Sequence, residues 1–67
     1  MDILIIETDP DVRTAAINAV KSALRKHRPN IVDCEDLIVG AGFIASPAHN
    51  FKIIICSETV YQSEGAG

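Results

Sequence analysis

Two almost wholly apolar runs constrain the fold of this chain more than any other feature. Residues 3–6 read Ile-Leu-Ile-Ile, and residues 51–56 read Phe-Lys-Ile-Ile-Ile-Cys. Runs rich in β-branched residues that do not alternate with polar ones are typical of strands buried on both faces. We therefore predict strands at residues 2–7 and 51–56. A further strand is predicted to begin at residues 31–34, which read Ile-Val-Asp-Cys.

The clearest helix signal lies between the first two predicted strands. Asp9 is suited to cap a helix, and Pro10 fits the first helical position, where no backbone donor is needed. Pro29 disfavours helical geometry at the residue before it, so the helix is predicted to run to about residue 28. At about 100° per residue its apolar side chains fall on one stripe, with His27 packed near the centre. The stripe consists of Val12, Ala16, Ala19, Val20, Ala23 and Leu24.

Residues 35–45 fit two interpretations. They extend the second strand, with the glycines at 40–42 as a bulge or turn, or they form a short second helix capped by Asp36. We favour the first, a small α+β domain of βαββ topology with one amphipathic helix on a three-stranded mixed sheet. Its first two strands are parallel and its third is antiparallel to the second. The alternative is a truncated βαβαβ unit.

The length and composition limit the class of protein. A chain of 67 residues is expected to hold one domain, here residues 1–62, followed by a disordered tail at residues 63–67. No run approaches the roughly 18 apolar residues of a transmembrane helix, and Asp2 stands where a signal peptide would be basic. We expect a cytoplasmic protein. The net charge of −3 argues against non-specific nucleic-acid binding as the main activity.

The residues that often carry chemistry are isolated from one another. Cys34, Cys56, His27 and His49 show none of the paired spacings of metal sites, and the two cysteines are interpreted as small core residues on neighbouring strands. Residues 40–45, Gly-Ala-Gly-Phe-Ile-Ala, fit a dinucleotide fingerprint, with Glu58 where an acid should meet the ribose. Because Pro47 leaves barely two helical turns after the glycines, a turn is preferred there. We predict no enzymatic activity, no cofactor and no metal.

The opening of the chain resembles a response-regulator receiver domain. In that family an apolar strand ends in an acidic cluster that binds magnesium, and a helix follows. The resemblance covers residues 2–28 and would match Glu7 to the first acid. Thr8 stands in the place of the second acid, and residues 54–57, Ile-Ile-Cys-Ser, lack the phosphoacceptor aspartate. The resemblance implies a degenerate signalling domain, whereas helix capping explains the same acidic residues without magnesium.

Two surfaces are candidates for interaction. A basic cluster near the end of the predicted helix complements the helix dipole and is the candidate partner-binding surface. One helix covers only one face of the sheet, so the other face would expose aliphatic side chains, with Ile54 as the candidate self-association residue of a two-fold dimer. The basic cluster consists of Lys21, Arg25, Lys26 and Arg28.

We therefore predict a non-enzymatic protein-binding module that forms a homodimer. It would act on a larger partner protein as a small inhibitor or adaptor, of the kind carried by phages and other mobile elements. One alternative is a degenerate receiver-like signalling domain. The other is a nucleic-acid binder that uses the basic cluster.

Overall fold

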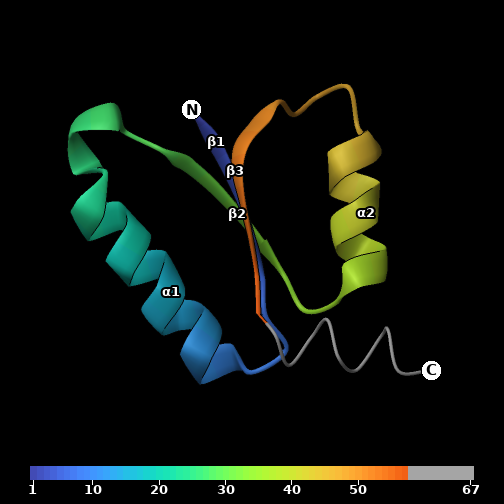
Figure 1. The fold of residues 1–67 in the computed structure, drawn as a ribbon, viewed down its shortest axis with the longest axis horizontal. Helices are drawn as coiled ribbons and strands as arrows, with labels where there is room; N and C mark the ends of the chain where they lie inside the picture. Colours follow the sequence, from blue (N-terminus) through green and yellow to red (C-terminus); the bar gives the residue numbers. More distant parts are fainter. Residues whose placement is uncertain (58–67) are drawn as a thin grey trace.

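The computed structural model, which describes residues 1–57, contains one three-stranded sheet with a helix on either face (Figure 1). The strand order is β2-β1-β3, and both outer strands run parallel to β1. The predicted domain end at residue 62 and the predicted tail lie outside the described residues. In chain order the elements are β1 (Asp2–Ile6), α1 (Pro10–Ala23), the 3₁₀ helix η1 (Arg25–His27), β2 (Asn30–Cys34), α2 (Leu37–Ala45) and β3 (Phe51–Cys56).

The small α+β architecture is confirmed, but the predicted βαββ topology with a mixed sheet is wrong. The chain follows the alternative βαβαβ order, because residues 37–45 form the helix α2. Asp36 caps it by accepting a hydrogen bond of 2.8 Å from the backbone N–H of Val39. A helix between β2 and β3 returns the chain to the amino end of the sheet, so the next strand must be parallel. Right-handed crossovers to opposite edges place α1 and α2 on opposite faces, as Figure 1 shows.

The first helix begins as predicted and ends earlier. Asp9 accepts hydrogen bonds from the backbone N–H groups of Asp11 (2.8 Å) and Val12 (3.2 Å), and Pro10 occupies the first helical position. After Ala23 the chain tightens into η1, and Arg28 takes a left-handed backbone conformation with φ 47°. The 100° periodicity therefore fails beyond residue 24. Within the predicted stripe, Val12 is 50% exposed, and Ala19 and Ala23 are exposed as well. His27, predicted to be packed, is exposed instead.

The core is built around β1. Ile3, Leu4 and Ile5 are at most 1% exposed. Among the strands of residues 1–57, β1 alone is covered on both faces and both edges. Below α2, Leu4 and Ile6 pack against Cys34, surrounded by Val32, Leu37, Phe43 and Phe51. Cys34 is buried as predicted, but Cys56 is exposed. The two cysteines are not on neighbouring strands, because Ile6 lies between them in register.

Gly40 sets how closely α2 approaches the sheet. A Cβ atom at this position would lie 2.5 Å from Cδ1 of Ile6 and 3.5 Å from Sγ of Cys34. The same atom at Gly42 would meet nothing within 4 Å. Both glycines lie inside a helix, so the interpretation of residues 40–42 as a bulge or turn is wrong.

The two glycines should respond in opposite directions to alanine. Gly40→Ala should lower the free energy of unfolding by about 1–3 kcal/mol, because the buried Ile6 side chain must move to admit the methyl group. Gly42→Ala should raise it by about 0.5–1 kcal/mol, since alanine favours the helix and the site is open. Urea unfolding followed by circular dichroism measures both. Equal effects of the two substitutions would contradict the observed packing of α2.

Candidate functional site

β3 is an edge strand with poor cover on both faces. Ile53, Ile54 and Ile55 keep 37%, 47% and 37% of their surface exposed. The main contacts of α1 and of α2 are with β1 and β2, so both helices lean away from β3. A strand this apolar is normally covered on both faces. We define residues 51–56 as the β3 edge, the candidate interaction surface of the molecule.

An apolar groove borders the β3 edge on the α1 face. The groove has a volume of about 380 Å³ and lies between the second half of α1 and the strands β1 and β3. Ala19 and Ala23 form part of its helical wall, and their short side chains do not reach across to β3. The groove is lined by Ile3, Ala19, Val20, Ala23, Leu24, Ile53 and Ile55.

The backbone of β3 has an inner and an outer side. The N–H of Ser57 donates to the carbonyl of Ile6 at 3.2 Å, which fixes Ser57 on the side of β1. Because successive residues of a strand point their backbone groups to alternate sides, Ile53 and Ile55 also face β1. Ile54 and Cys56 then direct their N–H and C=O groups outward. No other strand of residues 1–57 lies on that side.

The opposite edge of the sheet carries an ion pair near its middle. Asp33 of β2 forms an ion pair with Arg13 of α1, with Nε and Oδ2 3.1 Å apart. Another nitrogen of the same guanidinium, Nη1, donates to the carbonyl of Glu7 at 2.8 Å, so Arg13 joins α1 to both β1 and β2. A charged residue on an edge strand discourages pairing with another chain. β3 also carries a charge, Lys52, but near its start, and residues 53–55 are uncharged. β3 is therefore the edge better suited to pairing.

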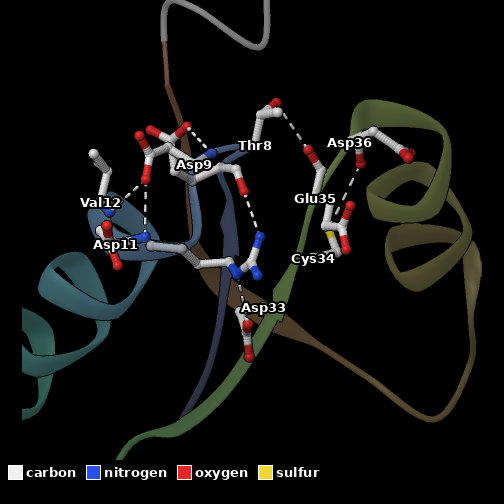
Figure 2. Close-up of polar contacts among 10 residues, drawn as sticks. Thr8, Asp9, Asp11, Val12, Asp33, Cys34, Glu35 and Asp36 are labelled. Atoms are coloured by element: carbon white, nitrogen blue, oxygen red, sulfur yellow. Dashed lines mark hydrogen bonds and ion pairs between the residues drawn. The ribbon is translucent and has the colours of Figure 1, made fainter.

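The acidic turn after β1 is occupied with local hydrogen bonds (Figure 2). Glu7, only 7% exposed, accepts a bond of 3.1 Å from the N–H of Asp9, whose own carboxylate caps α1. Thr8 Oγ1 donates to the carbonyl of Glu35 at 3.1 Å, which links this turn to the end of β2. Within residues 1–57, no three His, Cys, Asp or Glu side chains are grouped so that they could hold a metal ion.

At the amino end of the sheet, Asp2 links three segments. Its carboxylate accepts bonds from the side chain of Asn30 (3.2 Å) and the N–H of Asn50 (3.3 Å), and Nδ1 of His49 lies 3.7 Å away. The bond from Asn30, followed by that from Asn50, lowers the pKa of Asp2 below its ordinary value. These bonds therefore contribute stability above about pH 4 that is lost as the pH falls through the lowered pKa.

The four residues of the predicted basic cluster are all exposed. The structure places Lys21 in α1, Arg25 and Lys26 in η1, and Arg28 directly after it. In the described part of the chain, the ion pairs are formed by other residues. The cluster stays a candidate surface, and no described acidic side chain neutralises it.

Ile54 lies on the β3 edge, but the predicted reason for its exposure is wrong. The sheet face opposite α1 is not open, because α2 covers it over β1 and β2. Ile54 is exposed because β3 extends beyond both helices. The edge itself was not predicted, although three successive isoleucines in the last strand are a signal that could have indicated it.

The dinucleotide fingerprint does not form the geometry that it needs. Its glycines should precede a helix whose first turn holds a pyrophosphate. α2 instead begins at Leu37, before Gly40, and the side chain of Asp36 occupies its first turn. Glu58 lies outside the described residues.

Comparisons with protein-family models, with curated proteins and with solved structures find no match for this chain. Neither α1 nor α2 combines the length and the apolar character that crossing a membrane would require.

The acidic turn is expected to be structural. Asp9→Ala should lower the free energy of unfolding by about 0.5–2 kcal/mol, because two backbone N–H groups of α1 lose their acceptor. Thermal unfolding of the wild type with and without millimolar magnesium should give the same midpoint. A magnesium-dependent rise that Glu7→Gln abolishes would contradict this role and favour a receiver-like site.

Proposed function

We propose that this chain is a non-enzymatic protein-binding module of the inhibitor or adaptor type, which binds by adding a strand of another chain to the β3 edge. The observation that carries the proposal is the exposure of Ile53, Ile54 and Ile55 on an edge strand. In strand addition, backbone hydrogen bonds supply affinity, and alternate side chains supply specificity. The β3 edge offers both kinds of contact.

The two faces of β3 would present different surfaces to an incoming strand. On the α1 face, Ile53 and Ile55 continue into the apolar groove, which an aliphatic side chain can extend across. On the α2 face, Ile54 neighbours the packed residues around Leu4, its partner in register. An added strand with aliphatic side chains on both faces would therefore match this edge.

A polar pocket beside β2 is poorly suited to catalysis, which supports a binding role. It has a volume of about 470 Å³ and includes Arg13, Asp33 and Cys34. Burial raises the pKa of the Cys34 thiol, and its Sγ donates to the carbonyl of Asp36 at 3.6 Å. A thiol that stays protonated at neutral pH is a weak nucleophile.

A second candidate is a degenerate receiver-like signalling domain. It is favoured by the parallel β2-β1-β3 order, with an acidic turn at the carboxyl end of the central strand. The carboxyl end of such a sheet is where open α/β folds commonly bind ligands. Magnesium-dependent labelling of the chain by a small phosphodonor would favour this candidate over the first.

The proposed function predicts that a charge on the β3 edge removes binding. The immobilised wild type is expected to retain a set of proteins, and Ile54→Lys should capture them at least about tenfold more weakly. A tenfold loss of affinity is about 1.4 kcal/mol. The cause is that the lysine must be desolvated beside the added strand. Ile38→Lys is the matched control, since Ile38 is 77% exposed on α2, away from the edge. Quantitative mass spectrometry of the retained proteins gives the measurement.

Equal capture by Ile54→Lys and the wild type would contradict the proposal. Circular dichroism of each variant shows that loss of capture is not loss of folding. A double charge reversal at Arg25 and Lys26 tests the basic cluster in the same experiment. Loss of capture in that variant alone would move the binding surface from the β3 edge to the basic cluster.

A further inference from the structure

We infer that the strand added to the β3 edge is β3 of a second copy of this chain, running antiparallel about a two-fold axis at Ile54. The inference rests on the proposed function, because it concerns the same edge. A second copy paired there would compete with a strand of any other protein. A two-fold axis perpendicular to the sheet requires the two β3 strands to be antiparallel. The two three-stranded sheets would then join into one.

The backbone of β3 fits this arrangement. Ile54 directs its N–H and C=O groups outward, as the bond from Ser57 to Ile6 implies. Two copies of Ile54 opposite each other form the hydrogen-bonded type of antiparallel pair, in which each N–H donates to the other carbonyl. A slip by one residue would place Ile54 opposite Ile53 or Ile55 of the second copy. The backbone N–H and C=O groups of Ile53 and Ile55 point toward β1 and could not bond to those of Ile54. The register centred on Ile54 avoids that mismatch.

The side chains of the edge are complementary to themselves in the same register. The sequence Ile53-Ile54-Ile55 reads the same in both directions, so Ile53 lies opposite Ile55 of the second copy on the α1 face. Ile54 lies opposite its own copy on the α2 face. Directly opposed β-branched side chains stabilise antiparallel pairs. The most exposed residue of the triplet, Ile54 at 47%, becomes the centre of the interface.

The distribution of charge also favours a second copy. At the amino end of the sheet Lys52 lies at the start of β3, on the strand next to Asp2. At the carboxyl end, Asp9 and Asp11 lie in the turn that begins α1. Antiparallel pairing places the amino end of each β3 beside the carboxyl end of the other. Lys52 of one copy therefore approaches the acidic turn of the second, which favours association.

The α1 face of the joined sheet gains a continuous apolar floor. Because the axis is perpendicular to the sheet, the grooves of the two copies lie on the same face, and each has Ile53 and Ile55 along its border with β3. Pairing at β2 offers no such surface. Asp33, held by Arg13 at 3.1 Å, would lie near the centre of a β2 interface and place like charges close together.

The experiment measures molar mass by light scattering on a size-exclusion column, from low to high micromolar concentration. The wild type and Ile38→Lys should reach twice the 7.2 kDa of one chain, and folded Ile54→Lys should stay at 7.2 kDa. A second measurement tests the register. Ile54→Cys in a Cys56→Ser background should form a covalent dimer on oxidation, since the Cα separation of about 5.5 Å in such a pair suits a disulfide.

The Cys56→Ser chain without the second substitution is the control and should stay non-covalent, because its remaining cysteine, Cys34, is 8% exposed. A wild type that stays at 7.2 kDa at high micromolar concentration overturns the second-copy inference. If Ile54→Lys still abolishes capture of another protein in that case, the proposed function stands without it. Two other results would overturn the inference, because each places the interface elsewhere. One is a dimer that persists in Ile54→Lys, and the other is a dimer that Ile54→Cys does not cross-link.

Discussion

Burial of β1 is the constraint on which the rest of the structure depends. Ile3, Leu4, Ile5 and Ile6 are at most 2% exposed, and they supply the floor on which both helices pack. Because β1 is the central strand of the described sheet, β2 and β3 are its edges. Arg13 and Asp33 close one edge with charge. The same central position leaves the isoleucines of β3 exposed.

Short sequence patterns were sufficient to predict the strands and the start of the first helix, because these depend on interactions between neighbouring residues. The three strands and the start of α1 were predicted, because β-branched runs and the Asp9-Pro10 pair act through neighbouring residues. α2 was not the favoured interpretation, since residues 37–45 are apolar throughout and show no helical period. The helix is favoured partly by a contact between residues far apart in the sequence. α2 packs on Ile6, and only glycine at position 40 leaves room for that contact. Because residues 35–45 were predicted to extend the second strand, the third strand was wrongly predicted to be antiparallel.

The candidate site could be predicted only in part for the same reason. Ile54 was identified as a self-association residue, but from the assumption of an uncovered face, whereas the observed cause is its place on an edge strand. Whether a strand is central or at an edge depends on the direction of the crossovers, which single residues do not encode. The basic cluster is exposed as its composition implies, and its role depends on a partner that the structure of one chain does not contain.

Amide hydrogen exchange along β3, followed by NMR at two protein concentrations, tests the central claim most directly. The amides of Ile53 and Ile55 should be protected at both concentrations, because they face β1. The amide of Ile54 should exchange rapidly in dilute solution and become protected as the concentration rises and a second strand is added. An Ile54 amide that exchanges at the same rate at both concentrations would contradict the assignment of the β3 edge as a site of self-pairing.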